Sequence, residues 1–478
     1  MRKSALFTDF YELTMAQGYW KHGLDTRAVF DVFFRRQPFH GGYSVFAGLD
    51  PLLDALEEFR FSQEDLAWLE TQRIFEPAFL RYLEGFRFSG EIWAVDEGQV
   101  IFPQLPLLRI HGGIVEAQII EGLVLNSINF QSLIATKSAR VCLAAHGRKV
   151  MEFGLRRAQG FDGAMSASRA AYIGGASSSS NALAAKTLGI PAMGTMAHSW
   201  VMAFPDERSA FDAYASLYPD SSTFLIDTYD TLESGLPHAV EAGKALAAQG
   251  KRFGVRLDSG DIDYLSRKVR AALDRAGLQD AFIVVSNELD EEIIGRLVAE
   301  GAPVDVWGVG THLVTGGTEA SFTGVYKLAA VERDGALVPT MKFSDNPDKM
   351  TNPGVKEAFR LYDDAGMAVA DVLALEGDVI KAGVPRTFHH PSLDPRRFAI
   401  APCAEPKRLM SRVMADGRRL RPAEALPLIR ARAQAELARF DHTYLRMLNP
   451  HVYRVSVTEE LRALKLGFVE RFRNGRVG

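Results

Sequence analysis

Between residues 149 and 311, short apolar runs alternate with polar loops and helical segments. The apolar runs predict strands, and because parallel strands need crossover connections, the alternation indicates a parallel sheet. Six such units favour a (β/α) barrel, with an open sheet as the alternative. The predicted strands are 150–153, 191–193, 223–226, 253–257, 282–285 and 304–307. The predicted helices are 166–173, 208–217, 236–248, 264–276 and 291–300.

The residues before and after this region follow different patterns. The first 145 residues mix strands with helices, which predicts an α+β unit that folds on its own. Its predicted strands are 28–34, 91–95 and 107–111, and its predicted helices are 52–59, 63–69 and one or two helices within 114–145. We expect a strand at 324–331 and a loop at 342–356. The tail after residue 360 is less regular, apart from a helix over 428–448 that begins next to Pro427.

The composition places limits on the class of protein. The chain has 478 residues, 47% of them hydrophobic, and a net charge of −4, so we expect several globular domains without a strong field for nucleic acid or a membrane surface. No run of 18 apolar residues predicts a spanning helix, and the N-terminus resembles no signal peptide. We therefore expect a cytoplasmic protein. The cysteines, Cys142 and Cys403, are too few for a four-thiolate zinc site, so we expect buried, reduced thiols and no structural zinc.

Polar side chains follow the predicted strands. In a barrel, the loops after the strands meet at one rim, where barrel enzymes place their chemistry. The alternative for any one of these residues is an ordinary polar turn. The residues are Glu152, Arg156, Thr195, His198, Asp227, Thr228, Arg256, Asp258, Asp261, Ser286, Asn287, Gly310 and Thr311.

A glycine-rich segment, GVGTHLVTGG at 308–317, follows the last predicted strand. Glycines there let backbone N–H groups approach an anion, as in the phosphate loops of many barrels. The segment matches neither the dinucleotide-binding nor the P-loop pattern, and a plain turn is the alternative.

The segment VRLDSGD at 255–261 places Arg256 and Asp258 on one face of a strand. The oxygens of Asp258 and Asp261 suit Mg²⁺ or sugar hydroxyls, although Asp261 also fits a helix N-cap. His198, in GTMAHSW, follows another strand, where a lone histidine is more often structural. The arginines of EFGLRRAQGFD at 152–162 suit phosphate or carboxylate groups, with a solvated surface as the alternative.

Collinear motifs over residues 6–360 make this chain resemble the nicotinate phosphoribosyltransferase family. The motifs are TDFYELTMAQGYW (8–20), FRRQPFHGGYSVFAGL (34–49), NFQSLIATKSAR (129–140), EFGLRRAQGFDGAMSASRAAYIGGA (152–176), GTMAHSW (194–200), LIDTYDT (225–231), GVRLDSGD (254–261), SNELDE (286–291), GVGTHLVTGG (308–317) and GVYKLAA (324–330).

The resemblance implies a type II phosphoribosyltransferase fold. It comprises an N-terminal α/β sandwich (1–145, with parts contributed by later segments), an incomplete (β/α) barrel (146–360) and a small C-terminal region (361–478). It also implies a homodimer that joins nicotinate to 5-phosphoribosyl 1-diphosphate with ATP hydrolysis and Mg²⁺, in NAD biosynthesis. Some relatives carry a cysteine-bound zinc near the C-terminus, where this chain has Cys403 alone.

The resemblance also implies roles for individual residues. His198 matches the histidine that ATP phosphorylates. From the residues of VRLDSGD themselves, we also expect catalytic roles for Asp258 and Asp261. Tyr11, Thr195 and Arg256 match the nicotinate site, with Tyr11 stacking on the ring and reaching the site from a partner subunit. The expected phosphoribosyl diphosphate contacts are Gly310, Thr311, Arg156, Arg157 and Lys137.

Three other functions remain as alternatives. A nicotinamide phosphoribosyltransferase would share the fold. A barrel lyase or aldolase would need a Schiff-base lysine, for which Lys327 is the candidate. A non-catalytic binding barrel would not need so many charged groups at one rim.

Overall fold

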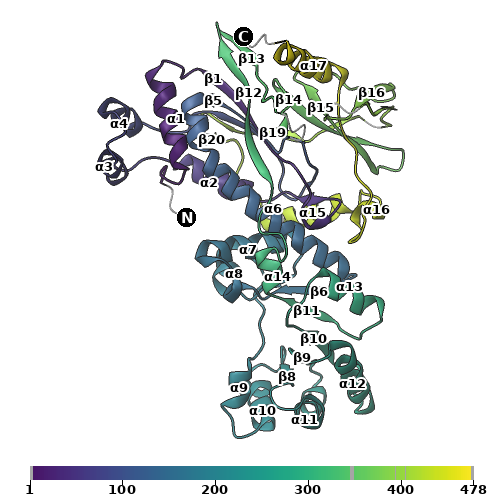
Figure 1. Cartoon of the computed structure of the whole chain (residues 1–478). Helices are drawn as coiled ribbons and strands as arrows, with labels where there is room; N and C mark the ends of the chain where they lie inside the picture. Colours follow the sequence, from purple (N-terminus) through teal and green to yellow (C-terminus); the bar gives the residue numbers. More distant parts are fainter. Residues whose placement is uncertain (1–3, 345–348, 393–394, 404, 475–478) are drawn as a thin grey trace. The chain divides into compact units, whose positions relative to one another are not determined.

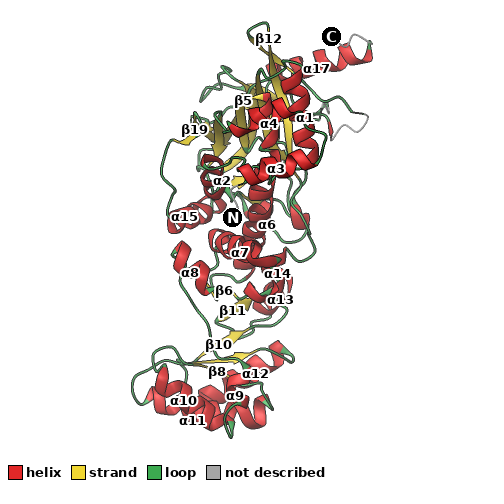
Figure 2. Ribbon diagram, turned by 90° about the vertical axis from the view of Figure 1, so that its left-hand side faces the viewer, coloured by secondary structure: helices red, strands yellow, loops and turns green. Residues whose placement is uncertain are grey.

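The computed structural model describes residues 4–344, 349–392, 395–403 and 405–474. The chain forms two compact units (Figures 1 and 2). One combines Met1–Leu133 with Ser321–Gly478, and the other is Ile134–Ala320. These units differ from the predicted segments 1–145, 146–360 and 361–478, because late strands of the chain pair with early ones.

A seven-stranded antiparallel sheet forms the centre of the first unit, in the order β13-β12-β1-β5-β3-β19-β20. β1 pairs with β5 on one side and with β12 on the other, so Phe30 lies opposite Ile110 and Leu328. β19 pairs with β3. The strands are β1 (Arg27–Phe34), β3 (Glu91–Val95), β5 (Leu108–Gly113), β12 (Gly324–Arg333), β13 (Ala336–Pro339), β19 (Met410–Ala415) and β20 (Arg418–Arg419).

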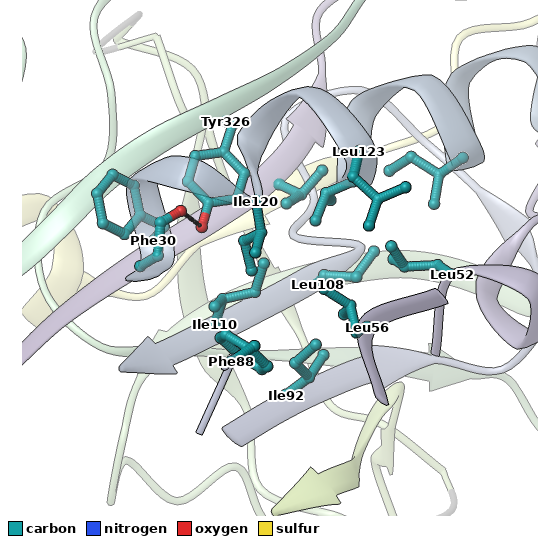
Figure 3. Close-up of a cluster of buried hydrophobic side chains, with 14 of the residues drawn as sticks. Phe30, Leu52, Leu56, Phe88, Ile92, Leu108, Ile110, Ile120, Leu123 and Tyr326 are labelled. Atoms are coloured by element: carbon teal, nitrogen blue, oxygen red, sulfur yellow. Dashed lines mark hydrogen bonds between the residues drawn. The ribbon is translucent and has the colours of Figure 1, made fainter. Parts of the chain in front are cut away.

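Helices pack against this sheet through apolar faces. The helices are α1 (Phe10–Lys21), α2 (Leu49–Glu57), α3 (Gln63–Thr71), α4 (Pro77–Glu84), α5 (Ile114–Ile119) and α6 (Glu121–Ala144). The core contains Leu108 and Ile110 from the sheet with Leu56 from α2 and Leu123 from α6 (Figure 3). Burying each such side chain contributes roughly 1.5–3 kcal/mol. The apolar stretch 114–145 thus forms two helices, one of the two predicted outcomes.

The C-terminal tail is more regular than its sequence predicts. It forms a six-stranded sheet, β17-β16-β21-β15-β14-β18. Arg360, where the less regular tail was expected to begin, is fully buried, and its Nε donates to Asp371 at 2.8 Å. The strands are β14 (Lys356–Tyr362), β15 (Ala368–Leu375), β16 (Arg386–His389), β17 (Arg397–Ile400), β18 (Lys407–Arg408) and β21 (Val455–Val457).

Three helices accompany this sheet: α15 (Leu426–Leu437), α16 (His442–Leu445) and α17 (Glu459–Arg473). Pro427 lies in the first turn of α15, as predicted, but α15 ends at Leu437. Asp441 then caps the separate helix α16. The predicted helix over 428–448 was therefore too long. A short ladder of β2 (Ser44–Val45) and β4 (Val100–Ile101) completes the strands of the first unit.

The second unit contains a six-stranded sheet, β7-β6-β11-β10-β9-β8, in which every pair is parallel. Figure 1 shows helices between successive strands. This is the incomplete (β/α) barrel that the family resemblance implies. The strands are β6 (Lys149–Glu152), β7 (Ser178–Ser179), β8 (Thr223–Leu225), β9 (Gly254–Leu257), β10 (Phe282–Val285) and β11 (Val306–Val309). The helices are α7 (Gly160–Gly174), α8 (Ala182–Leu188), α9 (His198–Met202), α10 (Glu207–Leu217), α11 (Leu236–Ala247), α12 (Ile262–Arg275), α13 (Glu291–Ala299) and α14 (Thr311–Thr315).

Two strands of the second unit and the burial of both cysteines differ from expectation. β7 lies within 177–180, where no apolar run predicted a strand, and the predicted strand 191–193 makes only an isolated parallel bridge, Ser179 with Ala192. Cys403 is exposed and Cys142 half-buried, so the prediction of two buried thiols was wrong. Among the described residues, no helix is both long enough and apolar enough to cross a membrane.

Candidate active site

Side chains that follow β8, β9 and β10 meet at the carboxyl end of the parallel sheet. Arg256, near the end of β9, is the centre of this group, and its side chain is 11% exposed. Its Nε donates to Ser286 Oγ at 2.9 Å, and its Nη1 donates to Thr195 Oγ1 and to the Met196 carbonyl. Its Nη2 donates to Asp258 Oδ1 at 3.1 Å. The guanidinium is thus held in one orientation by four partners.

Asp258 joins Arg256 to His198. His198 Nε2 lies 3.8 Å from Asp258 Oδ2, and His198 Nδ1 lies 3.1 Å from Thr228 Oγ1. Burial alone would raise the pKa of Asp258, but the hydrogen bond from Ser286 and the charge of Arg256 lower it below its usual value. Asp258 is therefore a carboxylate at neutral pH, next to a histidine whose side chain is 41% exposed.

Asp227, after β8, supplies a second carboxylate to this group. Its Oδ2 accepts from the Asp258 backbone N–H and from Ser259 Oγ. Its Oδ1 is buried and accepts no hydrogen bond within the described part of the chain. Because a buried carboxylate oxygen without a partner is costly, this atom is suited to a cation or a hydroxyl group from a ligand.

Asp261 caps α12, since its carboxylate accepts from the Tyr264 backbone N–H at 3.0 Å. The N-cap alternative for this residue is therefore correct as a description of its structural role. Glu152 is similarly engaged within the protein. Its carboxylate accepts from Ser168, Ser179 and the backbone of Gly154.

The glycine-rich segment forms a second group of predicted residues. Gly310 precedes the short helix α14, and Thr311 Oγ1 lies 3.5 Å from Glu288 Oε1. Glu288 follows Ser286 by two residues, so the loop after β10 contacts both groups. Arg156 and Arg157 form a short 3-10 turn after β6, and both are exposed.

Lys137 is buried, in contrast to these arginines. Its Nζ pairs with Glu291 Oε2 at 2.5 Å, and Arg140 pairs with the other oxygen of Glu291 at 2.7 Å. The ion pairs join α6 to α13 within the second unit. The charge of Lys137 is therefore compensated inside the protein.

Tyr11 lies in the first turn of α1, in the first unit, and is 51% exposed. The structure thus brings Thr195, His198, Arg256 and Asp258 together, and Tyr11 is not part of that group within one chain.

Sequence reasoning placed Ser286, Asp227 and Thr228 at the rim without giving them roles. Their roles depend on contacts between loops 30 residues or more apart in the chain. Asn287 has a φ of 109°, which is unusual for a residue with a side chain. No sequence signal indicated this conformation or the contribution of the Met196 carbonyl.

The described residues contain no cluster of three or more histidine, cysteine, aspartate or glutamate side chains that could hold a metal ion. The carboxylates of Asp227 and Asp258 nevertheless provide hard oxygen atoms. Such a pair suits Mg²⁺ when substrate oxygens complete its shell.

Three family models match the chain in succession. They describe the N-terminal domain of nicotinate phosphoribosyltransferase (residues 6–129), the nicotinate phosphoribosyltransferase family (148–362) and the C-terminal domain (355–465). The chain belongs to the nicotinate phosphoribosyltransferase family.

Individual relatives agree with this membership. A nicotinate phosphoribosyltransferase of Bacillus subtilis is 42% identical over 81% of this chain and 79% of its own length. The human protein of that name is 36% identical over 96% of this chain and 95% of its own length. The crystal structure of human nicotinic acid phosphoribosyltransferase superposes with a TM-score of 0.84 at 32% identity, covering 97% of this chain and 99% of that one. Nicotinate-nucleotide pyrophosphorylase from Pyrococcus furiosus, at 22% identity and a TM-score of 0.70, shares the fold.

This membership bears on the alternative classes. The chain is an enzyme of the phosphoribosyltransferase class, so the sequence-based resemblance is confirmed. Lys327, the lysine that a barrel lyase would need, lies on β12 of the antiparallel sheet, and its Nζ donates to the Tyr326 carbonyl at 2.6 Å. It is not at the end of a parallel strand.

Proposed function

We propose that the protein transfers the phosphoribosyl group of 5-phosphoribosyl 1-diphosphate to nicotinate. The products are nicotinate mononucleotide and diphosphate. The observation that carries the proposal is the fixed guanidinium of Arg256 beside Thr195, Asp258 and His198 at the rim of the parallel sheet. A fixed cation with hydroxyl and backbone groups around it suits the carboxylate of nicotinate.

In this reaction, the pyridine nitrogen forms a bond to the anomeric carbon as the bond to diphosphate breaks. Positive charge develops on the ribose ring and negative charge on the leaving group. Carboxylates near the ring stabilise the former, and Asp258 and Asp227 are suited to this. The leaving diphosphate needs cationic contacts, for which Arg156 and Arg157 are exposed and available. Mg²⁺, held by aspartate and substrate oxygens, would supply further positive charge there.

Gly310 and Thr311 are suited to the 5′-phosphate, since they lie at the start of α14, where the first N–H groups of a helix have no partner within the helix. Lys137 is less suited to contact the diphosphate, because it already pairs with Glu291. Asp261 is less suited to a catalytic role, because its carboxylate already caps α12. Tyr11 would stack on the nicotinate ring from the partner subunit of a homodimer.

ATP coupling through His198 is the second part of the proposal. The γ-phosphoryl group passes from ATP to a ring nitrogen of His198, ADP leaves, and water later hydrolyses the phosphohistidine. Thr228 at Nδ1 and Asp258 near Nε2 fix the orientation of the ring. His198→Asn should abolish synthesis-linked ATP hydrolysis and keep slow ATP-independent synthesis. Linked hydrolysis that persists undiminished in the variant would exclude His198 as the acceptor.

One assay tests the transfer itself. Purified protein is supplied with the phosphoribosyl donor, Mg²⁺ and either nicotinate or nicotinamide, with and without ATP, and mononucleotide and diphosphate are measured. We expect nicotinate to exceed nicotinamide in kcat/KM by at least about 100-fold, since the amide leaves the cationic site unpaired. Equal or better use of nicotinamide would favour nicotinamide phosphoribosyltransferase activity. Absence of donor-dependent release of mononucleotide and diphosphate would refute the proposal.

A further inference from the structure

Ser286 lies at the carboxyl end of β10, between two charged side chains of the rim. Its backbone N–H donates to the Leu257 carbonyl at 3.0 Å, which continues the parallel pairing of β9 with β10 by one further bond. The residue is 4% exposed. The backbone of Ser286 is therefore anchored to the sheet, and its hydroxyl has a fixed place beside Arg256 and Asp258.

The hydroxyl forms one hydrogen bond in each direction. A guanidinium can only donate and an ionised carboxylate can only accept, whereas a hydroxyl does both. Arg256 Nε donates to Ser286 Oγ at 2.9 Å, and Ser286 Oγ donates to Asp258 Oδ1. The one proton of the hydroxyl is thus committed to Asp258, and a lone pair is committed to Arg256.

The two oxygens of Asp258 have different surroundings. Oδ1 accepts from Ser286 and from Arg256 Nη2, the latter at 3.1 Å. Oδ2 lies 3.8 Å from His198 Nε2. Two donors on Oδ1 restrict rotation of the carboxylate, so the bond from Ser286 helps to keep the other oxygen towards the histidine.

Arg256 depends on the same hydroxyl along one edge of its guanidinium. Thr195 and the Met196 carbonyl accept from Nη1, and Asp258 accepts from Nη2. Within the described part of the chain, Ser286 is the one acceptor for Nε. Without the hydroxyl, this edge of a mostly buried guanidinium would lack an acceptor, which is costly.

We propose that Ser286 is a positioning residue that couples recognition of the pyridine carboxylate at Arg256 to the reaction at His198. The coupling arises because one hydroxyl holds both Arg256 and Asp258. The inference rests on the proposed function and extends it, since Ser286 acts through these two side chains and need not touch a substrate.

Kinetics of the full-length Ser286→Ala variant test this. The ratio of kcat/KM for nicotinate to that for nicotinamide should fall about 2- to 10-fold, as expected for one lost hydrogen bond. The stimulation of synthesis by ATP should fall as well, because the carboxylate beside His198 is held less firmly. Ser286→Thr keeps the hydroxyl and should restore both quantities. A fall in only one of them, or in neither, would overturn the coupling.

The matched control is Ser266→Ala. Ser266 is a buried serine of α12 in the same unit, and its Oγ donates to the Asp263 carbonyl at 3.1 Å. Thermal melts should show that both alanine variants fold, and the control should keep the wild-type selectivity and ATP stimulation. Equal changes in the two variants would indicate general loosening of the unit and overturn the inference. Absence of transfer by the wild type would refute the proposed function as well, whereas a selective wild type matched by Ser286→Ala refutes this inference alone.

Discussion

At the scale of single residues, we predict that the fixed orientation of Arg256 makes the protein prefer nicotinate over nicotinamide. Four protein acceptors hold the guanidinium, so its position does not depend on a bound substrate. Arg256→Lys should keep the charge but lose the fork geometry, and Arg256→Ala should lose both. We expect each change to lower kcat/KM for nicotinate by about 10- to 150-fold and to have a smaller effect on nicotinamide.

Steady-state kinetics with both pyridines measure this. Weaker use of the phosphoribosyl donor with unchanged selectivity would show that Arg256 serves the donor phosphates instead. The control is Ser259→Ala. Ser259 lies beside the same group but its Oγ donates to Asp227 and not to Arg256, so the variant should keep the selectivity of the wild type.

Glu12 is a buried carboxylate next to the proposed ring-stacking residue Tyr11. It is 0% exposed, and one of its oxygens accepts no hydrogen bond within the described chain. Burial, together with the negative charge of Glu121 and against the hydrogen bond from Thr8, raises the pKa of Glu12 to about 7. Because the pKa of Glu12 is higher in the folded protein than its unfolded value of 4.5, ionisation of Glu12 does not lower the stability of the protein below pH 4.5. The free energy of unfolding then falls as the pH rises from 4.5 through 7.

Glu12→Gln should remove this loss. The unfolding free energy of the variant should exceed that of the wild type by an amount that grows by roughly 2 kcal/mol between pH 5 and pH 8. Urea unfolding across this range measures it. Glu64→Gln, at an exposed glutamate of α3, is the control and should show no such trend. A constant difference for Glu12→Gln would mean that Glu12 is already ionised at pH 5.

Motifs in the sequence singled out Thr195, His198, Arg256 and Asp258, because each lies in or after an apolar run that predicts a strand. The same reasoning could not show that Lys137 pairs with Glu291, more than 150 residues away. A lysine that binds a substrate and one that pairs with a buried carboxylate have the same local sequence. Contacts between distant elements therefore set the limit of prediction at this scale.

At the scale of elements, β6, β8, β9, β10 and β11 were predictable because a parallel sheet uses short, continuous apolar runs, whereas β7, which lies in a run of serines, was not. The strands of the tail were not, because buried ion pairs such as Arg360 with Asp371 place charges inside. A charged residue in a strand reads as a loop until its partner is known.

The ion pairs of Glu291 are the clearest case of an interaction that joins two elements, α6 and α13. Burial opposes the ionised form, but Lys137 and Arg140 lower the pKa of Glu291 below its usual value. The ion pairs of Glu291 therefore stabilise the protein at pH values above the usual carboxyl pKa of 4.5, and this stabilisation is lost as the pH falls below it and Glu291 is protonated. Glu291→Gln should remove the carboxylate that pairs with two buried cations and cost about 3–5 kcal/mol.

Thermal and urea unfolding measure this cost at neutral pH. The control is Glu292→Gln, at the adjacent exposed position, which should change stability by less than about 0.5 kcal/mol. If Glu291→Gln is equally neutral but raises the KM for the phosphoribosyl donor, Lys137 acts on the substrate as the family resemblance implies.

At the scale of the whole molecule, the antiparallel sheet makes the first unit discontinuous in sequence. β12 and β19 flank the N-terminal strands, and Tyr326 of β12 is buried with its hydroxyl donating to the Ala117 carbonyl at 2.6 Å. The sequence pattern indicated a self-sufficient unit over residues 1–145, since the pairing of β1 with a strand 300 residues later leaves no local signal.

The last prediction concerns this discontinuity. A fragment of residues 1–145 would expose the edge of β1 that β12 covers and the edge of β3 that β19 covers. Unpaired edges and uncovered core residues oppose folding and promote aggregation. We expect the fragment alone to show no cooperative thermal transition by circular dichroism. Co-expression with residues 321–478 should restore one, because the second fragment supplies both strands and the core residues Phe322, Tyr326 and Val413. A cooperative transition of fragment 1–145 alone would show that the N-terminal segment is an independent domain, as its sequence pattern first indicated.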